Sequence, residues 1–78
     1  MNDIIKNSIG ETLRNIRKSN LLNVAEVSKN TGINKDTIYR YERGKGNDLE
    51  VLSKLLEYYQ IPDFIIFFNK VYDNCHKK

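Results

Sequence analysis

The stretch of residues 23–45 constrains the fold of this chain more than any other part of the sequence. Asn23 is a favourable helix N-cap, and Glu26 three residues later completes a capping box. Gly32 then supplies the positive backbone dihedral that ends a helix. Asn34 follows as the N-cap of a second helix. The pattern predicts two short helices joined by a tight turn around Gly32.

The second of these helices has one apolar face and one polar face. Ile38 and Tyr41 form its buried stripe, and Gly44 is its stop signal. The polar face and the residues that follow it carry Lys35, Asp36, Tyr39, Arg40, Arg43 and Lys45. A capped helix with polar forks near its start and cations at its end suits the major groove of DNA. We interpret it as a recognition helix.

The segment resembles the helix-turn-helix of the phage repressor and Cro (XRE) family, in which LTQEELAEKTGVSRSTISRIERGK is a common type of line. The resemblance covers about residues 9–61, and the spacing of the shared residues is hard to mimic by chance. The positions in register are Leu22, Asn23, Val27, Thr31, Gly32, Ile33, Thr37, Ile38, Glu42, Arg43, Gly44 and Lys45. The resemblance implies an all-α, five-helix, lambda-repressor-like domain that binds double-stranded DNA.

The positive charge of the chain is concentrated on this segment. The 78 residues have a net charge of +3, and residues 29–46 hold five cations against two carboxylates. Residues 1–28 balance to +1 and residues 47–78 to −1, so the excess lies where a phosphate-binding footprint is expected. A solvated basic face is the alternative explanation. Charge placed on this particular motif favours DNA.

Four positions of the second helix are candidates for reading bases. Lys35 and Arg40 can donate to guanine, and Asp36 can accept from the amino group of cytosine. An acid in a first helical turn also stabilises the helix dipole without touching DNA, which is the alternative role of Asp36. Tyr39 can contact a thymine methyl group or a phosphate, or it can pack on its neighbours.

Phosphate contacts are expected at the helix N-termini and after the second helix. Backbone amides at the start of the Asn23 helix can bind phosphate with help from the helix dipole, and Asn34 is assigned to the same group. Arg43 and Lys45 are expected to hold phosphates without carrying sequence information. The family often has a DNA-contacting glutamine where this chain has Val24, so that contact is not carried over.

A first helix precedes the reading segment. Ser8 and Glu11 form a capping box for a helix that runs to about Ser19, and Ile4 and Ile5 could extend its start by a turn or two. Residues 9, 13 and 16 share its apolar face.

Arg17 lies on the inward edge of that helix, which is an odd place for a charge. The resemblance implies that it pairs with Glu42, late in the recognition helix. Burying either charge alone would be costly, so we expect a buried Arg17–Glu42 ion pair. The alternative is that Arg17 reaches solvent along its aliphatic stem.

Two more helices are expected after the reading segment. Asp48 caps the first, whose apolar face is Leu49, Leu52, Leu55, Leu56 and Tyr59. Pro62 marks the start of the second, predicted over residues 62–74. Its apolar residues form two adjacent stripes, Ile61, Ile65, Phe68 and Tyr72 in one and Phe64, Phe67 and Val71 in the next. This is too much apolar surface for one small core, so we expect a homodimer with Phe64, Phe67, Phe68 and Val71 at its interface.

Enzymatic, metal and cofactor chemistry find no support in the sequence. Cys75 and His76 adjoin in a polar tail without other ligands at metal spacing, and no glycine-rich phosphate loop is present. The first residues, MNDIIKNS, lack the basic region and apolar core of a signal peptide, and no apolar run approaches the length of a membrane span. A lone cysteine is usual in a reducing cytoplasm, where we expect this protein. One domain of residues 1–78 is expected, without an evident small-molecule effector.

The sequence therefore predicts a dimeric, sequence-specific DNA-binding regulator, most simply a repressor or autoregulator acting on an inverted repeat. Its size and aromatic C-terminal helix are similar to controller proteins of restriction-modification systems and to small phage or mobile-element repressors. A protein-interaction module, such as an antitoxin that binds a partner through its last helix, is the alternative. A further alternative is non-specific DNA packaging through charge alone.

Overall fold

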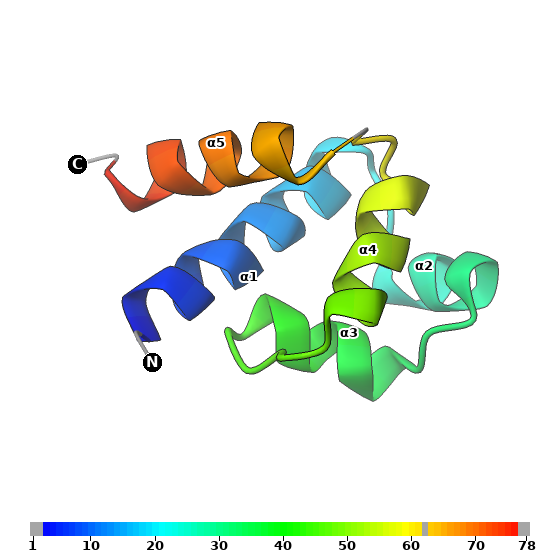
Figure 1. Ribbon diagram of the computed structural model, residues 1–78. Coiled ribbons are helices and arrows are strands. Elements are labelled where there is room, and N and C mark those ends of the chain that lie inside the picture. The colour runs from blue at the N-terminus through cyan, green and yellow to red at the C-terminus, as the bar shows by residue number, and fades with distance from the viewer. Residues whose placement is uncertain (1–2, 62, 77–78) are drawn as a thin grey trace.

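The computed structural model describes residues 3–61 and 63–76. That part of the chain is all-α and holds five helices (Figure 1), which confirms the predicted fold class. The helices are α1 (Asp3–Ser19), α2 (Val24–Thr31), α3 (Lys35–Glu42), α4 (Leu49–Tyr58) and α5 (Phe64–Cys75). None of these helices is long and apolar enough to cross a membrane.

One core joins all five helices. α1 packs against both α3 and α5, and Figure 1 shows α1 lying between those two helices. Five large side chains are almost completely buried, and each comes from a different helix: Leu13, Val27, Ile38, Leu55 and Phe67. Because every helix contributes to the same apolar cluster, removal of any one of them would expose part of it.

The helix ends in the middle of the chain follow the predicted capping residues. The Asn23 side chain accepts from the Glu26 amide at 2.8 Å, and the Glu26 carboxylate accepts from the Asn23 amide at 3.1 Å. Gly32 has a φ of 78° and ends α2. Asn34 and Asp48 cap α3 and α4 through their side-chain oxygens. Short polar side chains therefore satisfy backbone amides that each helix start leaves free.

The start of α1 differs from the prediction. The helix begins at Asp3, so it includes the extension through Ile4 and Ile5, and Ser8 lies buried in its interior. The Ser8 carbonyl accepts a hydrogen bond from the Thr12 hydroxyl at 2.7 Å. The proposed Ser8–Glu11 capping box is therefore wrong, because the chain is already helical before Ser8.

The orientation of α5 also corrects the prediction. Phe67 and Val71 were assigned to a dimer interface, but they are 0% and 5% exposed and belong to the core of their own chain. Asp63 caps the helix by accepting from the Ile66 amide at 2.9 Å. The start predicted at Pro62 lies outside the described residues.

Apolar side chains remain exposed on the rest of α5. They are Phe64, Ile65, Ile66, Phe68 and Tyr72. Leu49, predicted on the apolar face of α4, is also 69% exposed, because it lies in the first turn of the helix beyond the core. The prediction that α5 carries more apolar surface than the core can hold was right. The prediction of which apolar residues lie in the core and which lie outside it was not.

Candidate nucleic-acid interface

α3 presents its polar face to solvent. Ile38 and Tyr41 are buried, as the apolar stripe predicts. The four predicted base-reading residues are all exposed: Lys35, Asp36, Tyr39 and Arg40. Because positions 35, 36, 39 and 40 lie within about one side of a helix, these groups form one continuous surface.

A buried ion pair fixes α3 against α1. Arg17 Nε lies 2.7 Å from Glu42 Oε2, and Arg17 Nη2 lies 3.0 Å from Glu42 Oε1. The two side chains are only 10% and 5% exposed, which confirms the predicted pair. Because its guanidinium donates to the Glu42 carboxylate, the pKa of Arg17 is raised, so the guanidinium stays charged. A third bond, from Arg17 Nη1 to the Leu22 carbonyl at 3.0 Å, ties in the segment that leads to α2.

The turn between α2 and α3 is closed by local hydrogen bonds. The Gly32 amide donates to the Ser28 carbonyl at 2.9 Å. The Ser28 hydroxyl donates across the turn to the Ile33 carbonyl at 2.6 Å. The Thr31 hydroxyl accepts from the Ile33 amide at 3.2 Å. The turn therefore holds a fixed angle between the two helices without needing a long loop.

This arrangement was compared with known proteins. A family model described as a helix-turn-helix domain matches residues 8–63, which is more than half of the chain. The chain belongs to the helix-turn-helix domain family. Searches of curated proteins and of solved structures found no match.

In helix-turn-helix terms, α2 is the first helix of the motif and α3 is the second, recognition helix. The family match starts within α1 and ends at residue 63, directly before α5. The helix-turn-helix domain is a DNA-binding family, and α3 is the element that such a motif presents to DNA.

The predicted phosphate-binding cations follow the recognition helix. Arg43 and Lys45 are both exposed. Arg40 and Lys45 line one hollow of about 280 Å³ together with Thr37, so the structure brings a predicted base reader and a predicted phosphate binder together. Arg40 can thus reach a base edge while Lys45 contacts a phosphate close by on the same DNA groove.

The two asparagines assigned to phosphate have their side-chain oxygens engaged. Asn34 Oδ1 accepts from the Asp36 amide at 2.8 Å, and Asn23 Oδ1 is part of the α2 capping box. Any phosphate contact at these positions would therefore use amide N–H groups, which is the usual donor at a helix N-terminus. Val24 is buried, consistent with a packing role in place of the family's glutamine.

The connection between α3 and α4 is held by a residue whose role the sequence did not indicate. The Tyr41 hydroxyl donates to the Asp48 carbonyl and accepts from the Asp48 amide. The same ring packs against Gly46, so a side chain there would collide with it. Burial raises the pKa of Tyr41. A buried tyrosine often seeks a partner for its hydroxyl, and that tendency was the available signal.

Proposed function

We propose that this protein is a sequence-specific regulator that binds double-stranded DNA in the manner of the phage repressor and Cro (XRE) family. The observation that carries the proposal is the geometry of α3. Its base-reading candidates are exposed on one face, while Glu42 and Ile38 fasten the opposite side to the core. A rigid helix with a free polar face can enter a major groove without rearranging.

Each candidate has a defined task in this proposal. Lys35 and Arg40 donate to guanine, and Asp36 accepts from cytosine or stabilises the N-terminus of α3. Tyr39, which is 44% exposed, contacts a thymine methyl group or the backbone. Arg43 and Lys45 hold phosphates and set the register. The protein binds and does not catalyse, and it acts where its DNA is, in the cytoplasm.

The proposal includes a homodimer, with an interface revised from the sequence prediction. Phe64 and Phe68 lie one turn apart on the outside of α5, with ring centroids 6.3 Å apart, and each is about 40% exposed. Ile65 and Tyr72 are more exposed still. This exposed α5 face, defined by these four residues, can meet its own copy about a two-fold axis. Two recognition helices about 34 Å apart would then read an inverted repeat and repress a nearby promoter.

Selection of preferred sites from a random DNA pool tests the DNA proposal. We expect an enriched motif with inverted-repeat symmetry, and a higher affinity for it than for a scrambled sequence of equal length and composition. Equal affinity for both DNAs would contradict the proposal and would support packaging by charge alone.

The dimer is tested by Phe68→Glu, with Lys70→Gln as a control that changes the net charge equally on another face of the same helix. Both positions are exposed, so both variants should keep their helicity. Sedimentation should show a dimer for the wild type and for Lys70→Gln, and a monomer for Phe68→Glu, because a buried carboxylate in the interface is costly. A wild-type monomer at concentrations well above its DNA affinity would refute the dimer.

A second candidate function is an interaction module of the antitoxin kind. The observation that favours it is a mostly apolar hollow of about 350 Å³ beside the exposed α5 face, lined by Phe68, Ile5 and Leu49 among others. Such a hollow could accept a side chain of another protein. An antitoxin would need its partner to remain soluble during purification, whereas a dimeric regulator would not.

A further inference from the structure

Two hollows adjoin the connection between α3 and α4. One is the hollow of about 280 Å³ that Arg40 and Lys45 line, which we call the DNA-facing hollow. The other is the mostly apolar hollow of about 350 Å³, which we call the apolar hollow. Tyr41 and residues 46–48 line both of them. One short stretch of the chain therefore forms a wall that the two hollows share.

Tyr41 holds this shared wall in place. Its hydroxyl is hydrogen-bonded to the amide and the carbonyl of Asp48, and its ring lies against Gly46. Tyr41 follows Arg40 directly in the chain, and Lys45 directly precedes Gly46. Because a closely packed wall transmits a displacement to its neighbours, a change on the side of the apolar hollow should reach both cations of the DNA-facing hollow.

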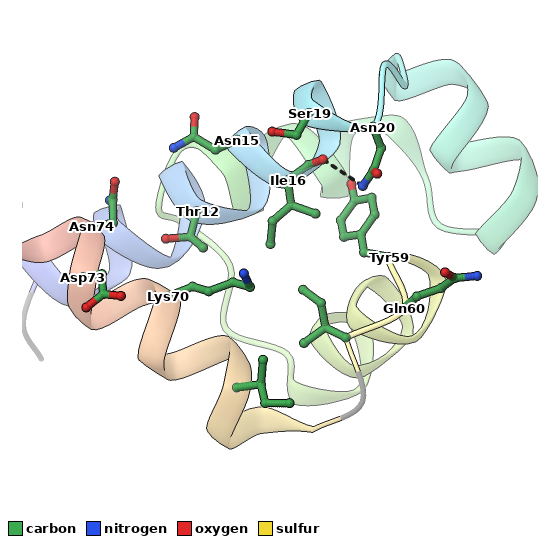
Figure 2. Close-up of a pocket in the computed structure, with 12 residues that line it drawn as sticks. Thr12, Asn15, Ile16, Ser19, Asn20, Tyr59, Gln60, Lys70, Asp73 and Asn74 are labelled. Atoms are coloured by element: carbon green, nitrogen blue, oxygen red, sulfur yellow. Dashed lines mark hydrogen bonds between the residues drawn. The ribbon is translucent and has the colours of Figure 1, made fainter.

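A larger cavity elsewhere in the molecule does not share this wall. Figure 2 shows it between α1, the segment 59–61 and α5, and its volume is about 690 Å³. Among the described residues, none lines both this cavity and the DNA-facing hollow. Two of its lining residues, Asn15 and Asn20, therefore serve as a reference for changes that are confined to the wall.

The apolar hollow is continuous with the exposed α5 face. Phe68 belongs to both, because it lines the hollow and lies beside the Phe64 ring. Ile5 of α1 and Leu49 of α4 also line the hollow, and they are 43% and 69% exposed. Three helices thus add large apolar side chains to one surface. A small molecule in the hollow would leave the α5 face uncovered, whereas a second copy of the chain covers both.

The charges beside the apolar hollow also suit a second copy. Lys6 and Asp48 line it, so the surface carries one charge of each sign. Two copies that meet about a two-fold axis present this same surface to each other, and a surface of mixed charge is then complementary to itself.

We propose that a second copy of the chain docks over the apolar hollow, and that this docking is linked to DNA binding through the wall held by Tyr41. The linkage rests on the dimeric DNA-binding function proposed for this chain. Docked side chains pack against residues 46–48 and restrict their motion. The same restriction is needed when Arg40 and Lys45 bind DNA, so each binding event lowers the entropic cost of the other.

Nuclear magnetic resonance of the full chain, recorded over a dilution series without DNA, tests the docking. We expect the backbone amides of Gly46 and Asn47 to shift as the dimer dissociates, because both residues line the apolar hollow. The side-chain amides of Asn15 and Asn20 should stay constant over the same series.

A matched pair of variants on α1 tests the position of the docking surface. Ile5→Gln should weaken the dimer by about tenfold, because it places a polar group in an apolar contact. Ile4→Gln is the control: Ile4 is 64% exposed, and it does not line the hollow, since one residue along a helix turns by about 100°. This variant should dimerise like the wild type in sedimentation.

A DNA duplex that carries a single half-site tests the linkage, because it cannot bridge two recognition helices. Saturating half-site DNA should tighten the wild-type dimer by about fivefold, and a scrambled duplex of equal length should not. Tyr41→Phe removes the hydroxyl that holds Asp48 but keeps the ring, so it should bring this factor close to one.

Three results would overturn the proposal. They are equal dimer strength in Ile5→Gln and Ile4→Gln, constant Gly46 and Asn47 amides while the dimer dissociates, and a dimer unaffected by half-site DNA. A wild type that stays monomeric would refute the docking together with the proposed dimer. Equal affinity for the half-site and the scrambled duplex would instead refute the proposed sequence-specific function, and the docking measured without DNA would stand.

Discussion

Arg17 and Glu42 illustrate how one pair of residues can fix the geometry of the whole site. Their two parallel hydrogen bonds join α1 to the last turn of the recognition helix. Both side chains are largely buried, so neither charge is solvated if its partner is lost. Such a pair contributes little net stability relative to apolar residues, but its rupture is expensive.

Arg17→Met should therefore destabilise the fold by about 3–5 kcal/mol, because Glu42 would be left buried and unpaired. The double change Arg17→Met with Glu42→Leu should recover much of that loss, since it removes both charges. Urea unfolding measures both free energies. If the single variant were as stable as the wild type, the pair would not be buried in solution.

The residues of the DNA-facing surface should divide into two functional groups. Arg40→Ala and Lys35→Ala should each weaken binding to the selected site by about 1–3 kcal/mol and relax preference at one base position. Lys45→Ala should weaken all sequences about equally and reduce the salt dependence by about one unit. Binding titrations at several salt concentrations distinguish the two groups.

Lys54→Ala is the matched control for these variants, because Lys54 is an exposed cation on α4 outside the reading segment. It should leave the affinity for every DNA nearly unchanged. A change of base preference in Lys45→Ala, without one in Arg40→Ala, would show that the assigned roles are reversed.

Tyr59 should make stability sensitive to alkaline pH. Its pKa is raised in the folded state, so above about pH 10 the unfolded chain loses the phenolic proton first. The free energy of unfolding should then fall as pH rises, until the folded pKa is passed. Tyr59→Phe should make this fall shallower than in the wild type as the pH rises above about 10. Equal slopes for Tyr59→Phe and the wild type, measured by urea unfolding, would contradict this.

At the scale of elements, α1 and α3 approach each other closely at Gly10. A methyl group built there would lie 2.6 Å from the Glu42 carbonyl oxygen, and the Tyr41 carbonyl is also in its way. Gly→Ala in a helix interior ordinarily gains up to about 1 kcal/mol. Here Gly10→Ala should instead cost about 1–3 kcal/mol, because the backbones must separate.

Thermal unfolding measures this effect, and Gly32→Ala is a useful comparison. Gly32 has open space around it and a φ of 78°, so its cost should come from backbone strain alone. Gly10→Ala should also lower DNA affinity, because α3 would shift against α1, while retention of full stability would show that the helices can separate freely.

The sequence predicted the elements better than their contacts. Asn23, Asn34 and Asp48 each cap a helix as expected, because capping depends on residues within one turn. Ser8 misled, since a serine can also sit inside a helix that began earlier. The rotation of α5 about its axis was unpredictable from its own pattern, because both stripes are apolar and only packing against α1 chooses between them.

The candidate site was predictable to the same degree. The exposure of Lys35, Asp36 and Arg40 follows from helical periodicity around Ile38 and Tyr41. The two hydrogen bonds between the Tyr41 hydroxyl and the Asp48 backbone, by contrast, join residues across a loop whose path no local rule specifies. The cavity of about 690 Å³ that Tyr59 lines likewise depends on distant parts of the chain, because its lining joins residues of α1 and α5 with the segment 59–61 after α4.

At the scale of the whole molecule, the hydrophobic core extends further along the chain than the family match does. The match ends at residue 63, yet α5 contributes Phe67, one of the most completely buried side chains. Asn74 of α5 also donates to the Glu11 carboxylate of α1 at 2.8 Å. Truncation of Phe67 to alanine should lower the free energy of unfolding by about 3–5 kcal/mol. That is a large part of the total free energy of unfolding of a typical protein, which is about 5–15 kcal/mol.

The burial of Phe67 therefore decides which part of the chain can be grafted onto another protein and still fold. The matched segment of residues 8–63 should not fold independently, because α5, which lies outside it, completes the hydrophobic core. A chimera that grafts residues 8–63 onto another dimerisation module should fail to fold, whereas one that keeps residues 1–76 should retain its target sequence. α5 is then required for DNA recognition because it stabilises the core that holds α3, even though none of the proposed DNA contacts belongs to α5.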